Sequence, residues 1–175
     1  ASDNSACRAD LSGAVTSNAS IKELTKKNTI SDLLKLSDSD KTVVIDNFKR
    51  YITFQQPVSV TIYGDDKQMI PRTFEEAFIY ENISYVKEKK IDAFVKLPSD
   101  IDYEVDYTTI FDTVKSKSYK KVEFALAQIE TEVKWITPAY IVNGLNWLSK
   151  TLGLVSEPIS EYDNSNSSTG QTKGE

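Results

Sequence analysis

The junction between an alternating strand and a strongly capped helix constrains the fold of this chain most. Residues 58–63 alternate apolar and polar side chains, as half-buried strands do. Further on, Thr73 is a favourable N-cap, and Glu76 three residues later completes a capping box. Phe74 and Phe78 give the following segment an aromatic face. The sequence therefore predicts a strand, a turn, and a helix that runs from Thr73 into the low eighties.

Glu75 lies in the first turn of that helix and is not needed for the capping box. If Phe74, Ala77 and Phe78 point into the core, Glu75 lies off the buried stripe and near the rim. One interpretation is that its carboxylate only complements the helix dipole. The other is that a cation or a phosphate is handled there, and the residues alone favour the first interpretation.

Apolar spacing and capping residues predict the other elements. Helices are expected over 18–26, 31–36, 107–114, 122–129 and 138–152, and strands over 41–45 and 51–54. In the last helix we expect Thr137 as the cap, Pro138 as the first residue and Gly153 just past the end. Gly144 inside that helix predicts a close contact, and Trp135 is expected at the joint between the last two helices.

These elements predict one α/β domain over residues 1–155, with a small sheet from the 41–63 region and several helices around it. The chain has 175 residues, of which 39% are hydrophobic, and this size suits a single core. Residues 156–175 are mostly polar, so we expect a disordered tail. No apolar run approaches the roughly 20 residues that span a bilayer, and no secretion signal is apparent. We therefore expect a cytoplasmic protein without membrane contact.

The residue types present narrow the chemistry. Cys7 is the only cysteine and histidine is absent, which excludes His/Cys zinc sites and Ser-His or Cys-His nucleophile pairs. Carboxylates, lysines and hydroxyls remain, and these suit hard ions such as Mg²⁺ or Mn²⁺. A net charge of −5 does not favour general attraction to nucleic acid, although four lysines fall within residues 115–121. A solvated helix entrance explains that run as well as a phosphate contact does.

Three separated segments resemble the C-terminal part of the Toprim domain of OLD-family (overcoming lysogenization defect) nucleases, in which an ABC-type ATPase is fused to a Toprim nuclease. The resemblance covers most of residues 5–153. The segments are Cys7-Arg8-Ala9 with 13–22, Arg72-Thr73-Phe74-Glu75-Glu76-Ala77-Phe78-Ile79, and Lys121-Val122-Glu123-Phe124-Ala125 with 135–138 and 144–148. The family's Ser-x-Glu motif falls on Thr73 and Glu75, and its functional lysine falls on Lys121.

The resemblance implies a partial Toprim-like (Rossmann-like) domain from a metal-dependent DNA endonuclease. It implies that Glu75 helps to hold Mg²⁺ or Mn²⁺, that Thr73 supports it, and that Lys121 places an ammonium near the phosphate. Arg72, Lys117 and Lys120 would then contact the DNA backbone.

The chain also departs from the family pattern. The upstream Glu and Asp-x-Asp ligands and the ATP phosphate loop are absent from this sequence. We therefore expect a fragment that is inactive alone, with ATP bound only through an ABC-type ATPase domain in cis.

Other interpretations of the same residues remain open. The acidic pairs 38/40, 65/66 and 100/102 are expected to be solvated surface or turn residues and not substitute ligands. Without the resemblance, Lys121 is interpreted as a surface lysine whose stem covers its helix. The chain as a whole could instead be a noncatalytic module that docks on an ATPase or forms a homodimer, with Trp135 and Trp147 at the interface.

Overall fold

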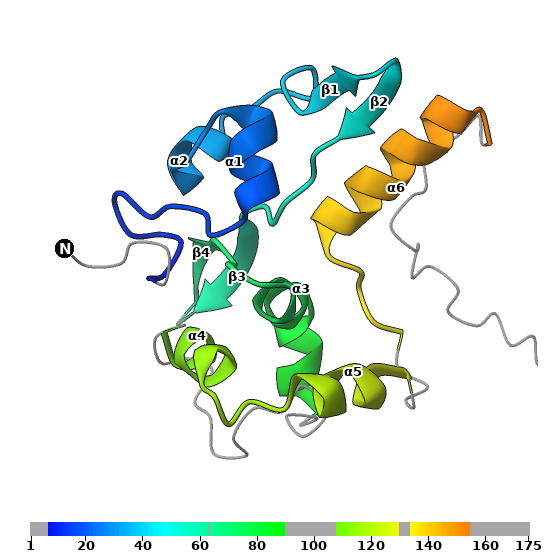
Figure 1. Ribbon diagram of the computed structural model, residues 1–175. Coiled ribbons are helices and arrows are strands. Elements are labelled where there is room, and N and C mark those ends of the chain that lie inside the picture. The colour runs from blue at the N-terminus through cyan, green and yellow to red at the C-terminus, as the bar shows by residue number, and fades with distance from the viewer. Residues whose placement is uncertain (1–6, 63, 90–107, 130–133, 155–175) are drawn as a thin grey trace, which may run out of the picture.

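Helices and strands are mixed along the chain, as predicted. The computed structural model describes residues 7–62, 64–89, 108–129 and 134–154 (Figure 1). The expected tail and the acidic pair 100/102 lie outside these ranges. The elements are α1 (Ala19–Thr25), α2 (Ile30–Leu33), β1 (Thr42–Ile45), β2 (Phe48–Tyr51), β3 (Val58–Ile62), β4 (Asp65–Met69), α3 (Phe74–Lys89), α4 (Thr108–Lys115), α5 (Lys121–Ile129) and α6 (Ala139–Leu152).

The strands form two separate antiparallel hairpins within the described residues, where the sequence predicted one small sheet. The turn between β1 and β2 holds Asp46 and Asn47 at φ 50° and 68°, the left-handed conformation that tight hairpins require. Between β3 and β4, Gly64 has φ 80°. Each strand pairs with its neighbour in the sequence. The expected strand over 51–54 is wrong, because β2 covers Phe48–Tyr51 and only Tyr51 belongs to both. A Toprim-like sheet stays a prediction.

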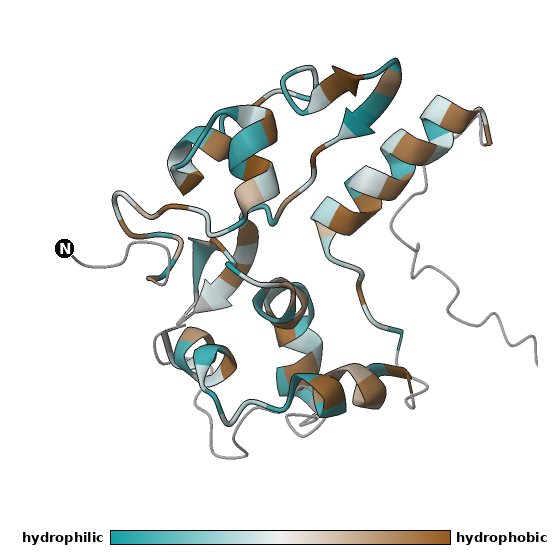
Figure 2. Ribbon diagram, in the orientation of Figure 1, coloured by the Kyte–Doolittle hydropathy of each residue, from teal (hydrophilic) through white to brown (hydrophobic). Residues whose placement is uncertain are grey.

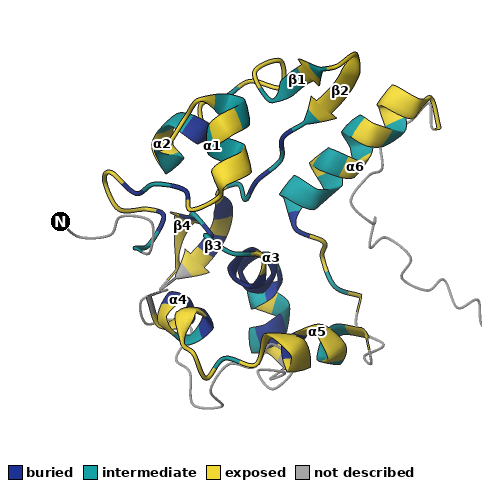
Figure 3. Ribbon diagram, viewed as in Figure 1, coloured by how far each residue is buried: buried dark blue, intermediate teal, exposed yellow. Residues whose placement is uncertain are grey.

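The main core is built around α3, which is the most buried helix in Figure 3. Ile79 and Val86 of this helix are fully buried against strand β3 and helices α4 and α5. The predicted capping box is confirmed: the Glu76 N–H donates to Thr73 Oγ1 over 3.3 Å, and the Thr73 N–H donates to Glu76 Oε2 over 3.2 Å. This reciprocal pair fixes where α3 begins.

A second, smaller core lies under α1, α2 and the first hairpin. Leu33, Ile52 and Phe54 are buried there, and Ile21 and Val43 pack against them. As the sequence predicted, α1 begins after Asn18, whose side chain accepts from the Ile21 N–H over 3.1 Å.

Side chains from α3 place the start of α6. Asn82 is buried, and it donates to the Ile136 carbonyl and accepts from the Ile136 N–H, over 3.0 and 2.8 Å. Glu81 Oε1 accepts from the Ala139 N–H over 3.3 Å. The predicted Thr137 cap is wrong, because Pro138 occupies the N-cap position without a side-chain hydrogen bond. Glu81 therefore supplies the carboxylate that the α6 N-terminus lacks.

The predicted end and close contact of α6 are confirmed. Gly153 ends the helix at φ 65°. A Cβ on Gly144 would lie 3.1 Å from Thr53 Cγ2. None of the helices in the described ranges has the length and apolar content to cross a membrane.

Candidate functional site

Glu75 and Lys121, which lie far apart in the sequence, meet in the folded chain. Lys121 Nζ lies 3.0 Å from Glu75 Oε1, and the two side chains come from the first turns of α5 and α3. The Glu75 side chain is only 12% exposed, whereas that of Lys121 is 56% exposed. The pair therefore lies at the rim of the core with its ammonium open to solvent.

Aromatic packing explains why these two side chains meet. Phe124 of α5 is almost completely buried, and its ring stands edge-on to those of Phe78 and Phe74, with centroids 5.4 and 6.2 Å apart. Side chains three apart on a helix lie on the same side. Seating Phe124 between Phe74 and Phe78 therefore brings Lys121, three residues earlier, against Glu75, three residues before Phe78.

Lys121 is the first residue of α5, a position that is unfavourable for a cation. The partial positive charge of a helix N-terminus disfavours an ammonium in the first turn. The carboxylate of Glu75 offsets that disadvantage from outside the helix. The lysine is thus held in place by tertiary structure and not by the preference of its own helix.

Glu75 stays ionised in this setting. Burial raises its pKa, but hydrogen bonds from its own backbone N–H, from Lys121 and from the Thr73 hydroxyl, together with the Lys121 charge, bring the pKa of Glu75 below its usual value. Thr73, Glu75 and Lys121 therefore form one hydrogen-bonded group. The three residues proposed by resemblance to the Ser-x-Glu motif and the family lysine are brought together by the fold.

Glu76, the next residue, has the opposite electrostatic character. Its side chain faces the core, and burial raises its pKa to about 7, even though the Arg72 and Thr73 N–H groups donate to it. Adjacent glutamates on one helix thus differ because one lies at the rim beside an ammonium and the other is enclosed. Glu76 serves the helix cap, as predicted.

Two tyrosines near Glu75 were not proposed from the sequence. Burial raises the pKa of Tyr119, and the negative charge of Glu75 adds to the increase. The same two causes raise the pKa of Tyr140 at the start of α6. Both phenols therefore stay protonated beside the carboxylate. Tyr119 could have been proposed from the sequence, because it lies two residues before Lys121. Nothing in the sequence linked Tyr140 to Glu75.

The proposed DNA-contacting lysines lie on the loop and helix entrance next to the site. Lys120, the residue just before α5, is exposed and pairs with Glu123 in the first turn of that helix over 2.9 Å. Lys117 is exposed in the connection between α4 and α5. Lys115, from the same basic run, lies over the Phe111 ring, 5.2 Å from its centroid. Contact of Lys117 and Lys120 with a nucleic-acid backbone stays a prediction.

Arg72 has a different position from the one that the proposed DNA contact suggests. Its guanidinium donates to the Cys7 carbonyl over 2.7 Å and also to the Val15 carbonyl. These bonds tie the N-terminal segment to the start of α3. A cavity of about 50 Å³ beside Arg72 is lined also by Thr16 and Phe54, among others, and not by Glu75 or Lys121. The structure thus gives Arg72 a role within the fold, and its contact with DNA stays a prediction.

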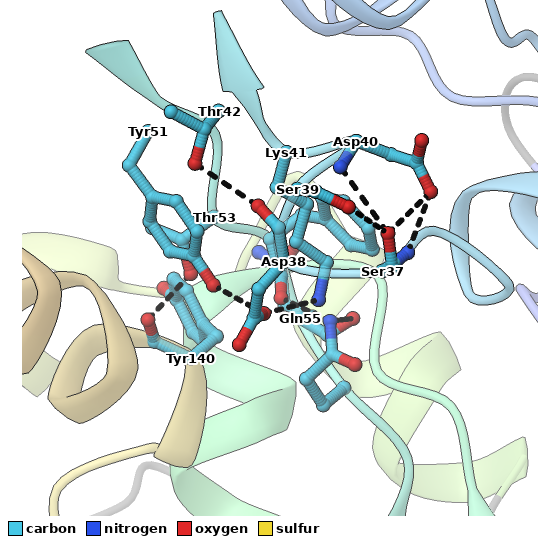
Figure 4. A network of polar contacts seen from close by, with 12 residues as sticks. Ser37, Asp38, Ser39, Asp40, Lys41, Thr42, Tyr51, Thr53, Gln55 and Tyr140 are labelled. Atoms are coloured by element: carbon cyan, nitrogen blue, oxygen red, sulfur yellow. Dashed lines mark hydrogen bonds and ion pairs between the residues drawn. The ribbon is translucent and has the colours of Figure 1, made fainter. Parts of the chain in front are cut away.

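The two acidic pairs within the described ranges, 38/40 and 65/66, do not converge on the site. Asp38 accepts from the Tyr51 hydroxyl over 2.9 Å, and Asp40 accepts from the Ser37 hydroxyl over 2.6 Å, as Figure 4 shows. Asp66 accepts from the Thr61 hydroxyl over 2.9 Å within the second hairpin. Asp38 and Asp40 are exposed, as the sequence interpretation expected. Asp65 and Asp66, expected in a turn, instead belong to strand β4.

The carboxylate and hydroxyl of Glu75 and Thr73 are oxygen donors of the type that Mg²⁺ prefers. Nowhere in the described ranges do three or more Asp, Glu, Cys or His side chains gather into a group that could hold a metal ion. Glu75 is a single carboxylate already paired with Lys121, so these residues do not form a cation site by themselves.

Comparison with family models, curated proteins and solved structures gave no match to this chain.

Proposed function

We propose that this chain is the C-terminal part of the Toprim domain of an OLD-family DNA endonuclease and that Thr73, Glu75 and Lys121 contribute to its phosphodiester-cleavage site. The observation that supports the proposal is the 3.0 Å approach of Lys121 to Glu75. The resemblance placed Glu75 and Lys121 in one site, although they belong to motifs that lie far apart in the sequence. Side chains on opposite sides of the molecule would have ended the proposal.

Each residue has a role that its surroundings allow. The half-exposed ammonium of Lys121 can leave the carboxylate and donate to a phosphate oxygen, where it would stabilise developing negative charge. Glu75, ionised and held by the Thr73 hydroxyl, presents a carboxylate oriented before any ligand arrives. A divalent cation would supply charge relief on the phosphate. The described residues offer no group of three or more ligands, and under this proposal the remaining ligands lie upstream of this chain.

The test compares this chain with a longer protein that also contains the upstream ligands. This chain alone should leave supercoiled plasmid DNA uncut in Mg²⁺ or Mn²⁺. In the longer protein, Lys121→Ala should lower the cleavage rate by about 100-fold or more, the usual effect of losing a transition-state donor. Glu75→Gln should lower it comparably, because it removes the negative charge that would help to hold the cation. Lys35→Ala, which removes an exposed lysine beyond α2, is the matched control and should cleave normally.

Two outcomes would contradict the proposal. If Lys121→Ala cleaves plasmid DNA as fast as the unchanged longer protein, Lys121 is not part of the site. Cleavage by this chain alone that Glu75→Gln abolishes would show that upstream ligands are not needed.

A noncatalytic interaction module is the second candidate, and exposed apolar side chains favour it. Val122 and Ile129 of α5 are 74% and 80% exposed. The tryptophans that the sequence placed at an interface are instead used inside the chain: Trp135 packs on Phe78, and Trp147 stacks on Tyr51. Under this candidate, Lys121→Ala would change neither cleavage nor association.

A further inference from the structure

Helix α6 carries two parallel stripes, and the less apolar one holds it to the rest of the chain. The inner stripe consists of Tyr140, Gly144 and Trp147, which lie at i, i+4 and i+7 and therefore on one face. The Thr53 hydroxyl donates to the Tyr140 carbonyl over 2.5 Å, and Gly144 lies against the Thr53 methyl group. The Trp147 ring stacks on Tyr51 of β2, with centroids 5.3 Å apart. Helix α6 lies beside β2 in Figure 1.

The second stripe is more apolar and faces away from these contacts. It consists of Ile141, Leu145, Leu148 and Leu152. The first three each follow a residue of the inner stripe by one position, and successive residues of a helix are turned by about 100°. The second stripe therefore lies about 100° further round the helix. We call it the leucine stripe. Its leucines are 50%, 45% and 59% exposed, and α6 has no fully buried residue. Figure 2 shows the apolar bands along this helix at the edge of the molecule.

A row of exposed leucines on a docked helix is unfavourable unless another surface covers it. Burying one such side chain contributes about 1.5 to 3 kcal/mol. The sequence that follows α6 is poorly suited to the task, since residues 155–175 contain only Val155, Ile159 and Tyr162 as hydrophobic residues. Within the described ranges the three leucines of the stripe stay exposed, and we consider a second copy of the chain as the covering surface.

The spacing of the leucine stripe is self-complementary. Its intervals of four, three and four residues are the same in both directions. In an antiparallel pair of α6 helices related by a two-fold axis, Leu145 meets Leu148 of the other copy, and Ile141 meets Leu152. A two-fold interface requires this reciprocity, and alternating steps of three and four residues are the spacing of a coiled-coil seam.

Charge also permits a second copy to approach. The chain has a net charge of −5, yet α6 contains no acidic residue and only one basic residue, Lys150. Ser149, which flanks the leucine stripe, is neutral. Two copies can therefore meet along α6 without the like-charge repulsion that most other faces of an acidic chain would cause.

We propose that a second copy of this chain covers the leucine stripe, forming a homodimer through antiparallel packing of α6 against α6. The helix has 14 residues and is about 21 Å long, so the seam is short. The dimer is accordingly weak and forms in a concentration-dependent manner. It does not depend on the nuclease assignment, because a monomeric nuclease and a dimeric non-nuclease are both compatible with the site geometry.

Sedimentation equilibrium from about 1 μM to about 1 mM tests the dimer, a range that spans weak affinities. The average mass should rise from 19.7 kDa towards twice that value. Leu148→Glu should keep the mass at 19.7 kDa throughout, because two carboxylates would face the seam. Val44→Glu changes an apolar side chain of β1 that is 63% exposed and should dimerise normally.

Circular dichroism separates loss of association from loss of folding. Leu148→Glu should keep the helical signal and the thermal midpoint of the monomeric protein. If the unchanged chain stays monomeric up to the highest concentration, the proposal is wrong. It is also wrong if Leu148→Glu unfolds the monomer, because the stripe would then be covered by another part of the same chain.

Disulfide trapping tests the direction of the pair. In a Cys7→Ser background, chains with Leu145→Cys are mixed with chains with Leu148→Cys and oxidised. Antiparallel packing predicts disulfides between the two different variants, at least several-fold above those between identical ones. A preference for identical variants would indicate a parallel pair and would overturn the proposed geometry.

Discussion

At the residue scale, neighbouring glutamates at the start of α3 show how position decides the behaviour of a carboxyl group. Glu75 lies at the rim and is ionised beside Lys121, whereas Glu76 is enclosed and its pKa is raised to about 7. The Thr-x-Glu spacing and the capping box are local patterns, and both point to this turn from the sequence alone. Only the packing of Phe124 shows that Lys121 reaches Glu75 and not Glu76.

The buried carboxyl of Glu76 should make stability depend on pH. Its pKa is raised from 4.5 to about 7 on folding, so the folded chain holds a proton that the unfolded chain releases between these values. Its stabilising contribution is full below pH 4.5 and is lost as the pH rises through 7, by roughly 3 kcal/mol at most. Glu76→Gln keeps an oxygen acceptor for the cap but cannot titrate.

Urea unfolding of the wild type and Glu76→Gln at several pH values from about 4.5 to about 8 measures this effect. The wild type should lose stability relative to the variant as the pH rises. Glu23→Gln, at an exposed position on α1, should show no such trend. A difference between wild type and Glu76→Gln that is the same at every pH would contradict the raised pKa.

At the scale of elements, α6 is the helix whose docking depends most on one small residue. Its apolar spacing and its Gly153 end are readable from the sequence, and the structure confirms both. Which of its two stripes faces inward was not readable. The leucines are the more apolar choice, yet Gly144 lets the helix approach Thr53, and Trp147 finds the Tyr51 ring, so the other stripe docks.

Gly144→Val should therefore release α6. Two methyl groups at Cβ would enter the space of Thr53, whose side chain already lies 3.1 Å from the position of a single Cβ. We expect a loss of about 1 to 3 kcal/mol in the free energy of unfolding, typical of overpacking. The near-ultraviolet signal of the Tyr51–Trp147 stack should also weaken.

Asn143→Val is the control for this experiment. It places the same β-branched side chain at an exposed position of the same helix, so it changes helix propensity without the clash. Equal effects of the two variants would show that Gly144 does not govern the contact.

At the scale of the whole molecule, long-range hydrogen bonds tie the N-terminal segment to the start of α3. The larger core surrounds α3, and the smaller one lies under α1, α2 and the first hairpin. Arg72 reaches from the start of α3 to the carbonyls of Cys7 and Val15. This residue thus stabilises the position of the N-terminal segment, a role different from the backbone contact with DNA that the sequence suggested.

Arg72→Met should loosen that segment. Leaving two carbonyls without their charged donor should destabilise the chain by about 1 to 3 kcal/mol and speed hydrogen exchange in residues 8–15. Arg50→Met, an exposed arginine in β2, should leave exchange there unchanged. Unchanged exchange in Arg72→Met would indicate that the N-terminal segment is held by other contacts.

The sequence by itself determined the elements whose signals are local. The cap of α3, the start of α1, the existence of helices α5 and α6 and the strand at 58–62 follow from hydrogen-bonding side chains and apolar spacing within a few residues. The predicted inward stripe of α5 is wrong, because Val122, Leu126 and Ile129 are exposed and Phe124 is buried instead. β4 was missed because four of its five residues are polar and exposed, so only its pairing with β3 defines it as a strand.

Tertiary structure decided everything that depends on partners distant in the chain. The separation of the strands into two hairpins, the inward face of α6, the engagement of Arg72 and the meeting of Glu75 with Lys121 are all such cases. The free energy of burying Phe124 and Trp147 exceeds local preferences there. Spacing along a sequence records which residues share a face, but packing selects what that face meets.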